Sequence, residues 1–183
     1  MSRAGAAPVV VRAAADADLP AIAELYAHHV LTGTASFEVD APTVKEMQRR
    51  HRDVVSRGLP YFVASLPGHG AALAGYAYAT EYRSRAAYRH TVEDSVYVDP
   101  GCVRRGAARA LLAAVIGTCE TLGYRQMIAV IGGSDNSASI SLHAALGFHH
   151  AGVLSAVGRK FDRWIDTVLM QRALGPGAST PAA

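Results

Sequence analysis

The sequence predicts a single α/β (α+β) domain with a mixed central sheet of about seven strands, flanked by about four helices. Strand-like and helix-like hydrophobic patterns are interspersed along the chain and do not form separate blocks. Half of the 183 residues are hydrophobic and 18% are charged, which is typical of a globular domain. The length is that of one domain, and no internal repeat or linker divides it.

The first half of the chain predicts one strand, two helices and a hairpin. An aspartate precedes the first helix as a capping residue, and the Gly-rich turn at 67–70 joins the last two strands of this half. In chain order the elements are a strand at 8–12, a helix that begins at Asp16 or Asp18, a helix after Pro42, and strands at 61–66 and 73–82.

The second half predicts strands and helices in turn. Apolar residues spaced three or four apart define its longer helix, Asn136 caps the shorter one, and a glycine ends each. In chain order the elements are a strand at 91–98, a helix at 108–122, a strand at 126–131, a helix at 136–146, and strands at 152–161 and 166–172.

The two ends of the chain differ from the domain between them. We expect residues 1–7 to be a flexible N-terminus and residues 8–174 to form the domain. Small residues dominate positions 175–183, which predicts a disordered tail.

Charge and hydropathy limit the class of protein. The net charge is only +3 and no basic run alternates with aromatic residues, so we expect no nucleic-acid partner. No apolar stretch is long enough for a membrane helix, and the N-terminus has no secretory signal. Cys102 and Cys119 are the two cysteines, too few for a disulfide scaffold. We therefore expect a cytoplasmic protein that does not bind membranes.

Residues 96–109 combine the end of a strand, a Pro-Gly turn and a small, basic segment that opens a helix. Uncovered backbone N–H groups and the helix N-terminus together form a site suited to a pyrophosphate. An ordinary arginine-rich helix start is the alternative. The small residues are Gly106, Ala107 and Ala108, and the arginines are Arg104, Arg105 and Arg109.

Two motifs resemble those of the GCN5-related N-acetyltransferases, the GNAT family. Residues 103–108 resemble its acyl-CoA motif Gln/Arg-x-x-Gly-x-Gly/Ala, with Val103 in place of the opening Gln or Arg. Residues 136–148 resemble its second motif, Asn-x-x-Ala/Ser ending in Gly-Phe. The resemblance extends over nearly the whole of 8–174. It implies the GNAT fold and acetyl-CoA as co-substrate, with no metal.

A narrower resemblance is to the phosphinothricin and methionine sulfoximine N-acetyltransferase branch of that family. It implies acetylation of the α-amine of an amino-acid-like molecule with a carboxylate at one end and a tetrahedral phosphinate, sulfone or sulfoximine group at the other. It also implies a homodimer. The segments that carry it are 34–38, 82–88, 91–98 and 158–166.

Glu93 is the candidate catalytic base. It lies in a predicted strand otherwise rich in Val, Tyr and Thr, where desolvation raises the pKa of a carboxylate toward that of a usable base. A solvated residue, or a partner for an arginine, is the alternative. The narrower resemblance assigns the catalytic glutamate to this position, where it takes the proton of the substrate ammonium directly or through a water.

His143 is the second catalytic candidate. Many GNAT enzymes have a general-acid tyrosine at this position, and the narrower branch tends to have histidine. The resemblance implies that His143 approaches the sulfur of CoA, where an imidazole could protonate the departing thiolate. An ordinary buried helix histidine is the alternative.

The remaining site residues follow from the basic segment and the resemblance. The cofactor-binding residues are Val96, Tyr97 and Val98 for the pantetheine arm, Arg104, Arg105, Gly106, Ala107, Ala108 and Arg109 for the pyrophosphate, and Asn136 and Ser139 of the second motif. The substrate-binding residues are Phe37, Arg83, Arg85, Tyr88 and Glu93. The arginines could clamp a carboxylate, because arginine pairs with carboxylates in a bidentate manner, and Phe37 could form a wall of the pocket. A solvated basic loop and an ordinary core phenylalanine are the alternatives.

Two other functions stay open on the sequence. A GNAT enzyme could acetylate a protein N-terminus or another small amine. Alternatively, the chain could be a CoA-binding sensor without turnover. The departure from the acyl-CoA motif at Val103 favours this alternative, and the presence of the candidate base Glu93 argues against it.

Overall fold

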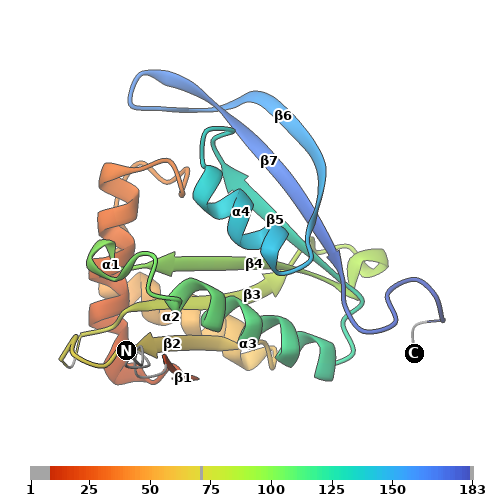
Figure 1. The fold of residues 1–183 in the computed structure, drawn as a ribbon, viewed down its shortest axis with the longest axis horizontal. Coiled ribbons are helices and arrows are strands. Elements are labelled where there is room, and N and C mark those ends of the chain that lie inside the picture. Colours follow the sequence, from red (N-terminus) through yellow and green to blue (C-terminus); the bar gives the residue numbers. More distant parts are fainter. Residues whose placement is uncertain (1–8, 71, 182–183) are drawn as a thin grey trace, which may run out of the picture.

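The computed structural model describes residues 9–70 and 72–181. These residues form one seven-stranded mixed sheet with four α-helices, in the strand order β1-β2-β3-β4-β5-β7-β6. The predicted fold class is confirmed (Figure 1). The predicted N-terminal segment 1–7 lies outside the described residues.

The first half of the chain supplies one side of the sheet. Each pair of neighbouring strands among β1, β2 and β3 is antiparallel, and the predicted hairpin turn at 67–70 joins β2 to β3. The Thr43 side chain caps α2 by accepting a hydrogen bond from the Glu46 amide. The elements are β1 (Val10–Ala13), α1 (Leu19–Thr32), α2 (Val44–Ser56), β2 (Tyr61–Ser65) and β3 (Gly75–Glu81).

The second half supplies the other side. The last two strands are longer than predicted, because β6 is a mostly exposed edge strand whose ends no hydrophobic pattern marks. The elements are β4 (Thr91–Val98), α3 (Ala107–Thr121), β5 (Gln126–Gly132), α4 (Ser137–Ala145), β6 (His149–Lys160) and β7 (Arg163–Ala173), with short 3-10 turns η2 (Ala86–Tyr88) and η3 (Pro100–Cys102).

Helices cover both faces of the sheet. Tyr97 of β4 contacts Tyr26 of α1, with ring centroids 5.0 Å apart. Asp94 of the same strand contacts His143 of α4. Because side chains alternate along a strand, residues 94 and 97 point to opposite faces. Helices α1 and α2 therefore cover one face, and α3 and α4 cover the other.

Strands β4 and β5 are paired only along their first halves. Their parallel register runs from Thr91 and Gln126 to Asp94 and Ala129. Beyond this point β4 stays paired with β3 as far as Val98, and β5 stays paired with β7 as far as Gly132. The two strands diverge toward their carboxyl ends (Figure 1). Both therefore have unpaired backbone edges at the centre of the sheet.

Strands β6 and β7 form a hairpin that extends past the rest of the sheet (Figure 1). Several of its apolar side chains are exposed, and Trp164 is the most exposed, at 67%. A row of exposed apolar side chains on an edge hairpin is typical of a protein–protein contact. The others are Val153, Leu154, Val157 and Phe161.

The described part of the C-terminal segment, as far as residue 181, contacts the domain, while the disorder of 175–183 stays a prediction. The guanidinium group of Arg125 donates hydrogen bonds to the carbonyl groups of Gly177, Thr180 and Pro181. A tail of small residues has few side-chain contacts to offer, so the composition did not indicate that its backbone carbonyls would be bound.

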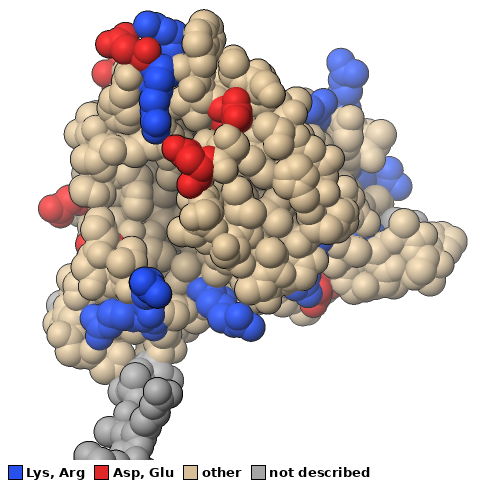
Figure 2. Space-filling view, turned by 45° about the horizontal axis from the view of Figure 1, so that its top comes forward, with Lys and Arg blue, Asp and Glu red and all other residues tan. Residues whose placement is uncertain are grey.

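The surface charge is dispersed. On the face shown in Figure 2, Lys and Arg form small separate groups on a largely uncharged surface. Among the described residues, no helix combines the length and the apolar character needed to cross a bilayer.

Candidate active site

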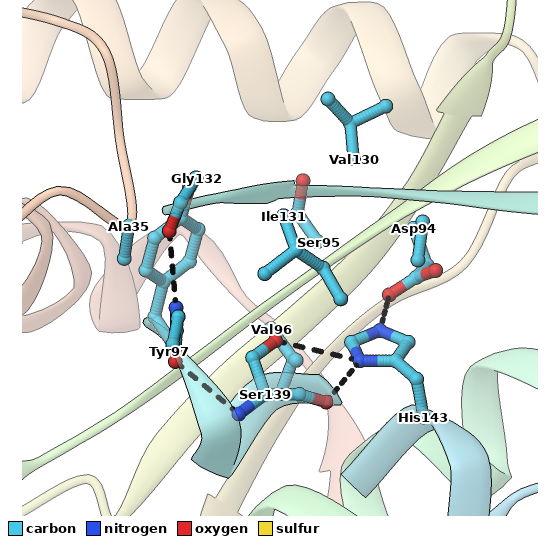
Figure 3. A pocket seen from close by; sticks show the side chains of 12 residues that line it. Ala35, Asp94, Ser95, Val96, Tyr97, Val130, Ile131, Gly132, Ser139 and His143 are labelled. Carbon is cyan, nitrogen blue, oxygen red and sulfur yellow. Dashed lines mark hydrogen bonds and ion pairs between the residues drawn. The ribbon is translucent and has the colours of Figure 1, made fainter. Parts of the chain in front are cut away.

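A cavity of about 60 Å³ lies where β4 and β5 diverge (Figure 3). Both strands, the start of α4 and the loop after α1 contribute to its walls. The lining residues are Ala35, Asp94, Ser95, Val96, Tyr97, Ala129, Val130, Ile131, Gly132, Asn136, Ser139 and His143. Five residues that the sequence analysis predicted for the site, Val96, Tyr97, Asn136, Ser139 and His143, are therefore together around one space.

The start of α4 is fixed by its own cap. The Asn136 side chain accepts a hydrogen bond from the Ser139 amide at 3.3 Å and donates one to the Gly132 carbonyl at 3.4 Å. Asn136 thus joins α4 to the end of β5, and its polar atoms lie at the cavity wall. The predicted N-cap is confirmed.

His143 and Asp94 form a buried pair on the α3–α4 face. The imidazole Nε2 lies 3.0 Å from Asp94 Oδ2, and Nδ1 lies 2.8 Å from the Ser139 carbonyl oxygen (Figure 3). A carbonyl oxygen only accepts, so Nδ1 carries a hydrogen. With Nδ1 occupied in this way, Nε2 donates to the Asp94 carboxylate when the imidazole carries both of its hydrogens.

The local environment favours the charged form of His143. Burial lowers the pKa of His143, but the hydrogen bond and charge of Asp94, together with the Ser139 carbonyl, outweigh it and raise that pKa. Asp94 Oδ1 is buried without a hydrogen-bond partner among the described residues. Asp94 therefore depends on His143 as its main partner, and each group holds the other in place.

Glu93 lies on the opposite, α1–α2 face of β4. It is paired across the sheet with Thr80 and shares its face with Ser95 and Tyr97. Burial raises the pKa of Glu93 to about 7, with a smaller contribution from the adjacent Asp94 carboxylate. A carboxyl group with this pKa is half-ionised near neutral pH, which is the property of an effective general base.

The turn before α3 and the first residues of that helix form a basic segment with free amides, here called the cradle loop (residues 104–109). Arg104 and Gly106 both have positive φ, at 61° and 89°, which turns the chain sharply before the helix. The first helical hydrogen bond is donated by Ala110 to the Gly106 carbonyl. The amides of residues 107–109 therefore have no acceptor within the helix, as an anion site requires.

The loop after α1 is held by buried polar contacts. Lys160, only 5% exposed, donates hydrogen bonds to the carbonyls of Gly33 and Ser36. The Phe37 ring lies against the backbone of Gly132 and Gly158, where a Cβ atom would overlap it. Phe37 therefore closes the α1–α2 side of the site beside the end of β5.

The predicted arginine cluster lies apart from the cavity, in the loop before β4. Arg83 and Arg85 line an open recess of about 410 Å³ with Ser84 and Tyr88. The Arg83 guanidinium lies 5.0 Å from the centroid of the Tyr82 ring and 5.6 Å from that of Tyr88. This recess is near the start of β4 and the cavity is near its end, so Glu93 lies between them along the strand.

Comparison with known proteins decides the family. Residues 11–169 match the model of the acetyltransferase (GNAT) domain. This chain is a GNAT-family acetyltransferase.

Relatives of this GNAT enzyme cover nearly its whole length. It is 56% identical to a phosphinothricin N-acetyltransferase of Alcaligenes faecalis, over 93% of this chain and 85% of that protein. It is 37% identical to an L-methionine sulfoximine/L-methionine sulfone acetyltransferase of Pseudomonas aeruginosa, over 93% and 98%. A GNAT superfamily phosphinothricin acetyltransferase from Sinorhizobium meliloti, crystallised with AcCoA, superimposes with a TM-score of 0.91 at 44% identity, over 96% and 93%.

Two residues of the GNAT site were missed by sequence reasoning. Asp94 was not singled out because its partner, His143, is 49 positions away and no spacing rule links them. An acidic pair in an otherwise apolar strand was the available signal. Lys160 is the second, because no sequence pattern indicated its hydrogen bonds to the carbonyls of Gly33 and Ser36.

Replacement of Glu93 by Gln is expected to stabilise the fold at high pH. The pKa of about 7 in the folded protein exceeds the ordinary value of 4.5 in an unfolded chain, so folding favours the protonated form. The destabilisation caused by ionised Glu93 is absent below pH 4.5, and it grows as the pH rises from 4.5 through about 7. Above pH ~8 the free energy of unfolding of Glu93→Gln should exceed that of the wild type by about 1–2 kcal/mol, after allowance for solvent screening. Urea unfolding at several pH values measures it.

The control for this experiment is Glu24→Gln on the exposed side of α1, which leaves the pH dependence unchanged. Equal stability of wild type and Glu93→Gln at every pH would contradict a desolvated carboxyl group at Glu93.

Replacement of Asp94 by Asn is expected to lower the pKa of His143. Without the carboxylate, the effect of burial dominates, so the imidazolium loses its proton at a lower pH than in the wild type. NMR titration of the imidazole measures the shift. Asp135→Asn is the control, because that side chain is 70% exposed and lies in the loop between β5 and α4. An unchanged His143 titration in Asp94→Asn would show that the pair is not coupled.

Proposed function

We propose that this GNAT enzyme transfers the acetyl group of acetyl-CoA to the α-amine of a small amino-acid-like acceptor of the phosphinothricin, methionine sulfoximine or methionine sulfone type. The observation that carries the proposal is Glu93, a carboxyl group with a pKa of about 7 on β4 beside the divergence from β5. The substrates named for the relatives from Alcaligenes faecalis and Pseudomonas aeruginosa support the acceptor class.

Several groups around the cavity support the binding of acetyl-CoA. Free amides of residues 107–109 and the arginines of the cradle loop suit its diphosphate. The unpaired edge of β4 at residues 96–98 offers backbone hydrogen bonds to the amides of the pantetheine arm. Asn136 and Ser139 lie on the far side of the same cavity. When bound, acetyl-CoA supplies the thioester whose acetyl group is transferred.

Glu93 accepts the proton that the acceptor ammonium must lose, either directly or through one water. The neutral amine then attacks the thioester carbonyl without a covalent enzyme intermediate. A backbone N–H of residues 96–98 stabilises the developing oxyanion, a contribution of about 3 kcal/mol for a well-placed donor. Holding the amine and the thioester together supplies much of the remaining acceleration.

His143 provides positive charge for the departing thiolate. Both of its ring nitrogens are already hydrogen-bonded, to Asp94 and to Ser139. It therefore acts first as a buried imidazolium beside the sulfur, and it donates a proton only after one of these bonds opens. Asp94 stabilises the charge of His143 and fixes its orientation.

The acceptor is recognised from the α1–α2 side. Phe37 forms one wall, and the recess with Arg83, Arg85 and Tyr88 binds the carboxylate of the acceptor. Arg83 already stacks on Tyr82 and Tyr88, so Arg85 is the arginine that we assign to the carboxylate.

We further propose that the enzyme is a cytoplasmic homodimer. The exposed apolar residues of the β6–β7 hairpin, with Trp164 at 67% exposure, support an interface between two copies.

A panel of acceptors tests the function. We expect thiol release from acetyl-CoA with phosphinothricin, methionine sulfoximine and methionine sulfone, and at least 10-fold lower kcat/KM when the carboxylate of the same acceptor is amidated, because the arginine loses its partner. Release with a peptide amine but not with these acceptors would favour a protein N-terminal acetyltransferase. Binding of acetyl-CoA without release on any amine would favour a sensor.

Replacement of Glu93 by Gln is expected to lower kcat/KM about 10²–10⁴-fold, the range of a lost general base. In the wild type the rate should rise with pH through about 7, as the carboxyl group ionises. The variant should lose this step. Steady-state rates across pH measure both effects, with Glu24→Gln as the matched control. Full turnover of Glu93→Gln with an unchanged pH profile would remove Glu93 from the mechanism.

A further inference from the structure

A second cluster of reactive side chains lies outside the cavity, beside the cradle loop. His69 belongs to the turn between β2 and β3, while Asp99 and Cys102 belong to the segment after β4. One ligand atom from each, an imidazole nitrogen, a carboxylate oxygen and the Cys102 sulfur, lie within 4.8 Å of one another. Within residues 9–70 and 72–181, these three residues are the group of His, Cys and acidic side chains whose ligand atoms lie close enough to hold one metal ion.

We propose that His69, Asp99 and Cys102 form a binding site for a thiophilic divalent ion such as Zn²⁺. Nitrogen, sulfur and carboxylate oxygen are the three ligand types that zinc takes in proteins, usually with tetrahedral geometry. At bond lengths of 2.0–2.3 Å, tetrahedral ligand atoms are about 3.5 Å apart. The cluster therefore needs its ligand atoms to approach one another by up to about 1.3 Å, with a water as the fourth ligand.

The surroundings of the cluster allow this contraction. His69 is half-buried in a turn where Gly68 and Gly70 both have positive φ, so its backbone is suited to local adjustment. Asp99 uses Oδ1 to accept a hydrogen bond from the Gly101 amide at 2.8 Å, which orients the carboxylate and leaves Oδ2 available as a ligand.

Cys102 is the ligand that gives the site its selectivity. Its side chain is buried, and burial, with the Asp99 carboxylate, raises the pKa of the thiol. Without an ion the thiol is protonated at neutral pH. When the sulfur–metal bond forms, the proton leaves to solvent and the thiolate is neutralised by the metal. A hard cation such as Mg²⁺, which prefers oxygen ligands, gains little from this sulfur.

An ion at this site would brace the cradle loop. The Arg105 side chain already donates a hydrogen bond to the Pro67 carbonyl at 3.2 Å, which links the β2–β3 turn to that loop. A metal bound by His69, Asp99 and Cys102 adds a second and stronger link, from the same turn to residues 99–102, which directly precede the cradle loop. We expect tighter acetyl-CoA binding as a result. A loop that the metal has already ordered loses less conformational entropy when acetyl-CoA binds. This consequence rests on the proposed function, whereas the site itself does not.

Titration of the full-length, reduced protein with Co²⁺ tests the site directly. We expect one equivalent to bind and to give a thiolate-to-cobalt charge-transfer absorption, which Zn²⁺ displaces and excess Mg²⁺ does not. Cys119→Ser is the matched control, because Cys119 is the other buried free cysteine and lies on α3 outside the cluster. It should keep the signal. Cys102→Ser should lose it, and His69→Ala should weaken binding at least 10-fold.

His69→Ala also guards against misfolding, because His69 lies in a turn while Cys102 is fully buried. No stoichiometric Co²⁺ binding, or a charge-transfer band that persists in Cys102→Ser, would overturn the site. The acetyl-CoA dissociation constant, measured with and without Zn²⁺, tests the coupling separately. We expect a severalfold decrease with Zn²⁺ in the wild type and none in His69→Ala. An unchanged constant with the metal bound would overturn the bracing of the cradle loop, and failure to bind acetyl-CoA under either condition would overturn the proposed function instead.

Discussion

The divergence of β4 from β5 is the constraint on which the site depends. Two parallel strands that stayed paired to their ends would satisfy each other's backbone groups and leave no space between them. Here the pairing stops at Asp94 and Ala129, while each strand keeps its other neighbour. The sheet is thus opened at its centre without losing its outer ladders. The opening places polar backbone, an aspartate and the start of α4 around one cavity.

The alternation of side chains on β4 gives the site two chemical sides. Glu93 faces α1 and α2, where burial, with a smaller contribution from the adjacent Asp94 carboxylate, raises its pKa. Asp94 faces α4 and is bound to His143. Two adjacent carboxyl groups therefore have different properties: one is suited to exchange a proton near neutral pH, and the other holds a histidine. The strand, by its pleat alone, separates the two roles.

The loops around this centre are held by contacts between distant segments. Lys160 at the end of β6 binds the carbonyls of the loop after α1, and Phe37 of that loop packs on Gly132 and Gly158. The cradle loop is linked to the β2–β3 turn through Arg105 and Pro67. Rigid strands and these few links position the walls of the site, which is the arrangement expected when precise geometry is needed at loops.

Local patterns in the sequence were enough to determine the elements and their class. The apolar faces of the helices, the cap at Asn136 and the Gly-rich turn at 67–70 depend on neighbours a few residues away, so local sequence patterns were enough to predict them. The basic helix start at 104–109 and the acidic residue in strand 91–98 could be read in the same way. Tertiary structure alone decided the pairing of Asp94 with His143, the separation of Arg83 and Arg85 from the cavity, the bonds of Lys160 to Gly33 and Ser36, and the approach of His69 to Cys102. These contacts join residues that are far apart in the chain, and only the order and register of the strands bring them together.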